Sequence, residues 1–322
     1  MIKALYAPPG GKAAEVSGEA EIARLVKGAQ GCLWVDLEAP TEAERRILSG
    51  IFGFHPVAVE RCTRTSNYPR LHDYGGYLYL VFHASEGVLP LVTKELDLFL
   101  SRHFLLTYHG EALPALAEVR RTAMEVEDLM GRGPDRVLAE LLDELADGYS
   151  ESLEKLSGAV DTVEDRLFKS ASRMALRDTF AMKKDVLHLR RIVSPQREIM
   201  NRLARGEFKV VSPEEAILFR DVHDRIQRSA EMLESFRDVL TSAMEMYLTV
   251  VSNRTNEIVK VLTIVSILLM SVSFVAGLYG MNIPLPLQAE GSQSRAAFWT
   301  LLLLMAAIAG GLLLLFRNRR WI

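Results

Sequence analysis

Apolar residues are concentrated in two uncharged segments near the C-terminal end of the chain. The first runs from 261 to 279 and the second from 296 to 316. At 1.5 Å per residue, helices of these lengths are roughly 28 and 31 Å long, which is enough to cross the hydrocarbon core of a bilayer. The pattern therefore predicts a transmembrane hairpin over 261–316, with a loop at 280–295 between its two spans.

Long helical patterns precede this hairpin, over 113–260. From 142 to 167 the apolar residues recur at three- and four-residue steps, as on one face of a helix. We expect Pro195 to interrupt or kink the run. The pair Ser212-Pro213 predicts a new helix start, and no Gly or Pro follows it until Gly277. One helix is therefore expected to continue from the stalk into the membrane without a break.

Residues 1–112 have the mixed pattern of an α/β region. Thr41 followed by Glu44 is the sequence of a capping box and predicts a helix over 41–52. Short runs rich in branched and aromatic residues predict strands at 32–37, 77–82, 96–100 and 103–108. The expected fold class is an α+β domain, followed by long stalk helices and a two-helix C-terminal transmembrane hairpin.

The charged flanks of the spans predict their orientation. Arg254 and Lys260 precede the first span and three arginines lie in the tail 317–322, whereas the loop 280–295 has Arg295 as its only basic residue. The positive-inside rule then places both termini, the domain and the stalk in the cytoplasm. The first twenty residues contain no apolar run of signal-peptide length. We therefore expect a multi-pass protein of the cell inner membrane.

One face of the first span and of the stalk before it is mostly polar or small. Alternating four- and three-residue steps give Glu245, Thr249, Ser252, Asn256, Val259, Thr263, Ser266, Met270, Ser273 and Gly277. Two membrane helices cannot enclose a water path, but such helices packed around a common axis can. A face of small residues is also typical of helix packing, so it leaves both interpretations open. Leucine runs at 301–304 and 312–315 make the second span lipid-like, which favours the first span as the pore-lining helix.

The end of the first span carries a family resemblance. The segment 252–263 leads into this span, and Gly280-Met281-Asn282 ends it directly after Tyr279. This arrangement resembles the CorA family of divalent-cation channels, whose hallmark is a Gly-Met-Asn tripeptide ending the first of two C-terminal membrane helices. The resemblance implies a homopentameric funnel in which five first helices line the pore.

The resemblance also assigns roles along this pore. Five Asn282 side chains would ring the outer mouth, and Asn256 would form a second amide ring near the cytoplasmic end. Amide oxygens can hydrogen-bond the water shell of Mg²⁺, which dehydrates reluctantly. Apolar positions between the two rings would gate by dewetting. The expected selectivity filter is Gly280, Met281 and Asn282, and the expected pore-lining and gate residues are Asn256, Val259, Leu262, Thr263, Ser266, Met270, Ser273 and Gly277.

Three carboxylates are expected to bind regulatory Mg²⁺. The segment 219–224 resembles a family segment that holds a closing sensor between subunits, and this places Asp221 in that role. Glu245 on the stalk matches a second acidic position, and Glu86, after the strand at 77–82, is the expected partner. The alternative for such acids is a solvated helix face, which we favour for the acids between 143 and 165.

The loop after the tripeptide bears on the identity of the ion. Many magnesium-type relatives have an acidic Met-Pro-Glu-Leu sequence there, whereas residues 283–294 contain Glu290 as their only acid. The related ZntB-type zinc transporters also lack the acidic sequence. The resemblance therefore implies influx of Mg²⁺, with Co²⁺ and Ni²⁺, and a ZntB-like transporter of Zn²⁺ is the alternative.

Composition excludes several other classes. The net charge of −3 gives no bulk basic character of the kind that marks nucleic-acid binding. Two cysteines cannot form a four-thiolate metal site. No phosphate-binding glycine loop, nucleophile elbow or paired catalytic motif is present, so we expect no enzyme. A membrane-anchored sensor or scaffold is the remaining alternative, and it would not require Asn282.

Overall fold

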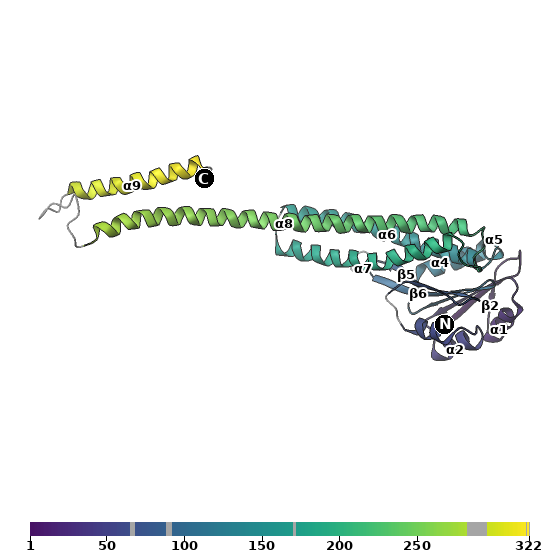
Figure 1. Cartoon of the computed structure of the whole chain (residues 1–322). Coiled ribbons are helices and arrows are strands. Elements are labelled where there is room, and N and C mark those ends of the chain that lie inside the picture. Colours follow the sequence, from purple (N-terminus) through teal and green to yellow (C-terminus); the bar gives the residue numbers. More distant parts are fainter. Residues whose placement is uncertain (65–67, 88–91, 170–171, 282–294, 320, 322) are drawn as a thin grey trace. The chain divides into compact units, whose positions relative to one another are not determined.

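The computed structural model describes residues 1–64, 68–87, 92–169, 172–281, 295–319 and 321. The chain divides into two compact units, Met1–Met244 and Glu245–Ile322. Helix α8 (Ala216–Tyr279) begins in the first unit and ends in the second (Figure 1).

The described part of the first unit contains a seven-stranded sheet in the order β2-β1-β3-β7-β6-β5-β4. Neighbouring strands are antiparallel except for the parallel pair β3 and β7. The strands are β1 (Ile2–Ala7), β2 (Ala14–Val16), β3 (Cys32–Glu38), β4 (Arg70–Asp73), β5 (Leu78–Glu86), β6 (Val92–Leu100) and β7 (Phe104–His109).

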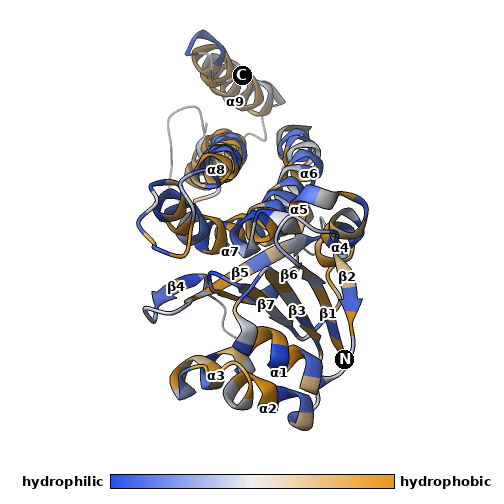
Figure 2. Cartoon of the chain, turned by 90° about the vertical axis from the view of Figure 1, so that its right-hand side faces the viewer, coloured by the Kyte–Doolittle hydropathy of each residue, from blue (hydrophilic) through white to orange (hydrophobic). Residues whose placement is uncertain are grey.

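Helices cover both faces of this sheet (Figure 2). One face carries α1 (Glu19–Gly28), α2 (Glu42–Gly50) and α3 (Pro56–Thr63). The other carries α4 (Pro114–Glu125), α5 (Glu127–Gly131), α6 (Pro134–Lys169) and α7 (Arg173–Ala204), and the first part of α8 lies beyond α7 on the same side. The strand period of two explains this arrangement: on β3, Leu33 and Val35 join one buried cluster, whereas Cys32 and Trp34 join the other. Both faces of the central strands are therefore buried.

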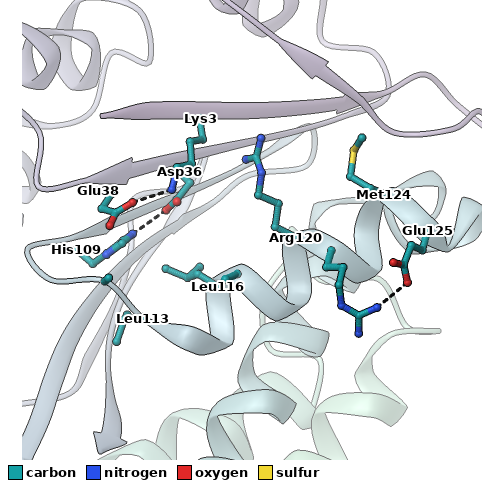
Figure 3. Close-up of a pocket in the computed structure, with 12 residues that line it drawn as sticks. Lys3, Asp36, Glu38, His109, Leu113, Leu116, Arg120, Met124 and Glu125 are labelled. Carbon is teal, nitrogen blue, oxygen red and sulfur yellow. Dashed lines mark hydrogen bonds and ion pairs between the residues drawn. The ribbon is translucent and has the colours of Figure 1, made fainter.

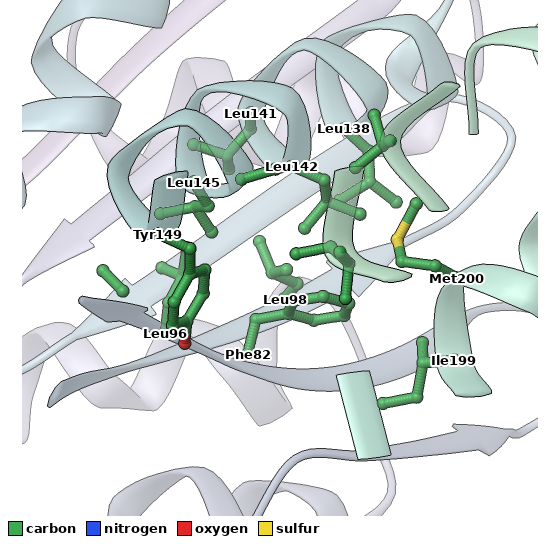
Figure 4. Close-up of a cluster of buried hydrophobic side chains, with 14 of the residues drawn as sticks. Phe82, Leu96, Leu98, Leu138, Leu141, Leu142, Leu145, Tyr149, Ile199 and Met200 are labelled. Carbon is green, nitrogen blue, oxygen red and sulfur yellow. The ribbon is translucent and has the colours of Figure 1, made fainter. Parts of the chain in front are cut away.

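The larger core lies between the sheet and the long helices (Figure 4). Phe82 from β5 and Leu98 from β6 are buried there with the apolar stripe of α6, and Met200 of α7 joins them. Burying one such side chain stabilises the fold by about 1.5–3 kcal/mol. The fully buried Tyr149 of α6 donates its hydroxyl hydrogen to the backbone oxygen of His83 at 2.6 Å. Apolar packing and this hydrogen bond together fix the long helices on the sheet.

The main expected elements are confirmed. The four expected strands correspond to β3, β5, β6 and β7, and the expected helix at 41–52 corresponds to α2. In the capping box, the Thr41 hydroxyl accepts from the Glu44 amide at 3.3 Å, and the Glu44 carboxylate accepts from the Thr41 amide at 2.8 Å. Three further strands (β1, β2 and β4) and two further helices (α1 and α3) were not expected.

The expectation that Pro195 interrupts the helical run is wrong. Helix α7 continues through this proline. Because proline has no backbone N–H, the helix loses only the one hydrogen bond that residue 195 would donate to the carbonyl of Arg191. The buried residues Ile192, Val193 and Gln196 around it keep the helix packed. The run instead divides where α6 ends at Lys169 and α7 begins at Arg173, with Ser172 as the N-cap.

Helix α8 is continuous over 64 residues, as the absence of Gly and Pro before Gly277 predicts. Its first turn follows Ser212-Pro213, since the amide of Ala216 donates to the Ser212 carbonyl at 3.1 Å. The second unit consists of the rest of α8 and of α9 (Arg295–Asn318) in its described part. Both α8 and the segment Phe298–Asn318 of α9 are long and apolar enough to span a membrane. The predicted fold class, without its pentameric assembly, is therefore confirmed.

Candidate ion pathway and acidic sites

The membrane part of α8 has an exposed face that contains most of the predicted pore residues. Met270 is 72% exposed, and the hydroxyls of Ser266 and Ser273 make no hydrogen bond among the described residues. Because an unpaired hydroxyl is costly in lipid, these serines are expected to meet water or another chain. We define the exposed face of α8 as Asn256, Val259, Leu262, Ser266, Met270, Ser273 and Gly277, whereas Thr263 is half-buried at its edge.

The opposite side of α8 forms the hairpin face, which is less exposed. It comprises Ile264, Ile267, Leu268, Ser271, Val272 and Val275. A matching stripe with three- and four-residue steps lies on α9 at Leu301, Met305, Ala309, Leu312 and Phe316. Since α9 is the other helix of this unit, we infer that the two stripes pack together. At about 100° per residue, the centres of the hairpin face and of the exposed face are about 155° apart around the helix.

Hydroxyls on the two sides of α8 behave differently. Ser271 on the hairpin face donates to the backbone oxygen of Ile267 at 2.7 Å, and Thr263 donates to that of Val259 at 2.7 Å. Ser266 and Ser273 on the exposed face remain available to a partner outside the described chain. The exposed face therefore offers hydroxyl and amide groups that a hydrated ion can contact.

The predicted filter begins at the end of α8. The Gly280 amide donates to the carbonyl of Ala276 at 2.9 Å, and the exposed Met281 donates to that of Leu278 at 3.3 Å. A side chain at Gly280 would come within 3.2 Å of the Ala276 carbonyl oxygen, which favours glycine there. The third filter residue, Asn282, lies outside the described residues.

Glu86 ends β5 and borders a cavity of about 480 Å³. Its carboxylate forms an ion pair of 2.7 Å with Lys94. Three more acids line this cavity from α6, namely Glu144, Asp147 and Glu151. Burial, followed by repulsion from Asp147, raises the pKa of Glu144. Lys94 was not expected as the partner of Glu86, because it comes from the neighbouring strand.

Asp221 is exposed on α8 and makes no ion pair among the described residues. One helical turn further along the chain, Arg225 pairs with Asp143 at 3.3 Å and also with Asp147, both on α6. Burial raises the pKa of Asp143, and Arg225 opposes this effect. Glu245, the third predicted acid, is exposed and belongs to the second unit.

The donor chemistry of these acids suits Mg²⁺, which prefers carboxylate and water oxygens. Among the residues that the structure describes, however, no group of three or more His, Cys, Asp and Glu side chains is placed to hold a metal. The one described chain therefore does not complete a metal site at Glu86, Asp221 or Glu245. A site there would need oxygens from water and from another copy of the chain.

A separate pocket of about 490 Å³ contains none of the predicted site residues (Figure 3). It lies where the parallel strands β3 and β7 end, and α4 forms its wall. Beside it, Asp36 and His109 form a buried ion pair of 3.0 Å, and the Thr107 hydroxyl donates to the same carboxylate oxygen at 2.6 Å. Thr107 and His109 lie 71 and 73 positions from Asp36 in the chain, so no sequence motif predicts these contacts.

Comparisons with known proteins agree with the fold and with the resemblance. A family model described as CorA-like Mg²⁺ transporter protein matches residues 29–319. The protein YfjQ of Bacillus subtilis is 31% identical over 288 residues, which cover 89% of each chain. The cobalt/magnesium transport protein CorA of Thermotoga maritima is 26% identical over 295 residues, 90% of this chain and 83% of the relative.

A solved structure shows the same fold over the full length. The complete structure of the CorA magnesium transporter from Methanocaldococcus jannaschii superposes with a TM-score of 0.82 at 22% identity, covering 100% of this chain and 99% of the other. Sequence and fold thus agree on a membrane transporter of divalent cations rather than an enzyme. The chain belongs to the CorA-like Mg²⁺ transporter family.

Proposed function

We propose that five copies of this chain assemble around a common axis, with the exposed face of α8 lining a path for divalent cations. The observation that carries this proposal is the division of α8 into two faces. The hairpin face is apolar apart from Ser271, whose hydroxyl donates to the backbone of its own helix, whereas the exposed face holds Asn256, Ser266 and Ser273 without partners among the described residues. A polar face facing lipid would be unfavourable, and five such faces around an axis would instead enclose water.

Selection takes place at the outer mouth, where the filter Gly280-Met281-Asn282 ends α8. Mg²⁺ holds its water shell tightly, so a ring of five Asn282 amides accepts hydrogen bonds from that shell without stripping it. Asn256 repeats this chemistry near the cytoplasmic end of the span. Mg²⁺ is the proposed main substrate, with Co²⁺ and Ni²⁺ carried by the same hydrated route.

The gate lies between the two amide rings. Val259, Leu262 and Met270 are 53%, 64% and 72% exposed in the single chain, so they are available to meet their copies at the axis. Rings of apolar side chains close a pore by excluding water, and a small rotation of α8 would open it. Thr263 and Gly277 complete the lining of the proposed path.

The membrane potential drives influx. An inside-negative potential of 100 mV favours entry by about 2.3 kcal/mol per charge, hence roughly 4.6 kcal/mol for a divalent ion. From the basic residues around both spans we propose that the two termini lie in the cytoplasm and that the membrane is the cell inner membrane.

Cytoplasmic Mg²⁺ closes the channel through carboxylates at subunit interfaces. Asp221 is exposed and unpaired among the described residues, so it can meet an ion shared with a neighbouring copy. Glu86 and Glu245 are the proposed further acids. A bound Mg²⁺ relieves the repulsion between two facing carboxylates, so loss of the ion loosens the interface.

Ion flux into proteoliposomes tests the proposal. Wild type and Asn282→Ala are compared with Mg²⁺, Co²⁺ and Zn²⁺ in parallel, and Ser271→Ala on the hairpin face is the matched control. We expect Mg²⁺ flux in wild type and in the control, and its loss in Asn282→Ala, because the amide ring at the mouth is removed. Flux of Zn²⁺ alone would favour the ZntB-like alternative. No flux of any ion from correctly inserted protein would favour the sensor or scaffold.

A further inference from the structure

The acids around Asp221 lie beside cations that belong to the protein itself. Arg225 pairs with Asp143 at 3.3 Å and also with Asp147. In the adjoining cavity, Glu86 pairs with Lys94 at 2.7 Å, and Glu151 pairs with Lys155. Asp221 has no such pair among the described residues. The part of this region where a regulatory ion would bind is therefore partly neutralised before any ion arrives.

Arg225 is the basic residue one helical turn after Asp221 on α8. It follows Asp221 by four residues on α8, the spacing that places two side chains on one helix face. Its guanidinium extends to Asp143 and Asp147 on α6, and Asp221 acts electrostatically on both Arg225 and Asp143. Two carboxylates of α6 thus contact one guanidinium, whose side chain is about one third exposed, and Asp221 lies one helical turn before it on α8.

A guanidinium fixed among carboxylates competes with a metal ion for the same oxygens. It reduces the negative potential that attracts Mg²⁺, and it occupies oxygens of Asp143 and Asp147 directly. Without Arg225, these two acids and Asp221 would repel one another, and a divalent ion would relieve that repulsion. The nearby Arg228 is exposed and forms no ion pair among the described residues. Substituting Arg228 therefore changes the net charge as much as substituting Arg225 does, but it removes no contact with Asp143 or Asp147.

We propose that Arg225 is a built-in cation that competes with Mg²⁺ for the carboxylates around Asp221, and so sets the Mg²⁺ concentration at which the cytoplasmic unit responds. This inference rests on the regulatory role proposed above for Asp221. It adds a residue that tunes that regulation.

The test is a Mg²⁺ titration of the full-length protein in detergent at constant ionic strength. At each Mg²⁺ concentration, limited proteolysis and thermal unfolding measure the response of the protein. Arg225→Gln removes the competing cation, and Arg228→Gln is the control for net charge. Asp147→Asn keeps Arg225 but removes one carboxylate. We expect Arg225→Gln to lower the half-maximal Mg²⁺ concentration roughly three- to tenfold, the size of one partly exposed charge interaction. Asp147→Asn should raise it, and Arg228→Gln should leave it unchanged.

The outcomes separate this inference from the proposed function. An equal midpoint for Arg225→Gln and wild type, or an equal shift with Arg228→Gln, overturns the inference. If Asp221→Asn also abolishes the wild-type response, the regulatory role of Asp221 still stands.

If wild type does not respond but Arg225→Gln does, competition by Arg225 is supported and regulation in the natural chain is contradicted. If neither protein responds, both are contradicted. Should Arg225→Gln fail to fold, an unchanged midpoint in Asp147→Asn overturns the inference.

Discussion

At the residue scale, His109 lines the pocket of Figure 3 and has a hydrogen-bond acceptor at each of its two ring nitrogens. Its Nε2 lies 3.0 Å from a carboxylate oxygen of Asp36, and its Nδ1 lies 2.6 Å from the backbone oxygen of Glu111. Since both partners accept hydrogen bonds, both ring nitrogens carry a hydrogen. Burial alone lowers the pKa of His109, but the hydrogen bond and the charge of Asp36 outweigh it, and the pKa is raised.

This raised pKa predicts how stability depends on pH. A group with a folded-state pKa above its unfolded value stabilises the fold fully below the unfolded pKa, near 6.5 for His, and less as the pH rises through the folded pKa. We expect His109→Gln to lower the free energy of unfolding by about 2–4 kcal/mol at pH 6 and by less at pH 9. Thermal unfolding of the full-length protein at the two pH values measures this. The exposed His103→Gln is the control, and an equal loss for His109→Gln at both pH values would contradict the charged pair.

At the scale of elements, hydrogen bonds and ion pairs connect the start of α8 to the start of α6. One carboxylate oxygen of the buried Asp135 accepts from the Ser212 amide at 2.8 Å and from its hydroxyl at 2.7 Å. Glu215, also buried, lies 3.7 Å from Arg132 and from Arg136. The helix that continues into the membrane is thus anchored by buried polar contacts at its first turn.

Loss of this anchor should destabilise the first unit. Asp135→Ala leaves two donors of Ser212 without their acceptor, which we expect to cost about 2–4 kcal/mol. Asp128→Ala is the matched control, because its exposed carboxylate pairs with Arg132 and its loss should change stability by less than about 0.5 kcal/mol. Chemical denaturation followed by tryptophan fluorescence compares the two variants. Equal stability of both would show that the anchor contributes little.

Sequence patterns predicted the helices and strands whose formation depends on residues close together in the chain. The capping residues Thr41 and Glu44 located α2, and helical periodicity alone placed the polar face of α8. The edge strands β2 and β4 have only three and four residues, and they are strands because they pair with β1 and β5. A sequence pattern this short does not reveal such pairing. The pair of Arg225 with Asp147 joins residues 78 positions apart, so it depends on how α6 packs on α8. The residues of the site were thus partly predictable, but their partners were not.

At the scale of the whole molecule, the proposed path exists only in an oligomer. One chain has a single polar face on α8, so a closed path requires several copies with cyclic symmetry. We expect the native mass in detergent to be about five times the 36.0 kDa of one chain, and chemical cross-linking to stop at the pentamer. A stable dimer in both measurements would exclude a path enclosed by α8 helices.

The central claim is that the exposed face of α8 lines the ion path. Ser273→Cys places a thiol on this face, and Ser271→Cys places one two residues earlier on the hairpin face. The native Cys32 and Cys62 are buried, and burial raises the pKa of both thiols, so they should not react.

The most direct measurement is Mg²⁺ flux of the two variants before and after a charged, membrane-impermeant thiol reagent. We predict that the reagent stops flux through Ser273→Cys and leaves flux through Ser271→Cys and wild type unchanged. Block of Ser271→Cys with an unaffected Ser273→Cys, or equal sensitivity of the two, would contradict the assignment of the exposed face to the ion path.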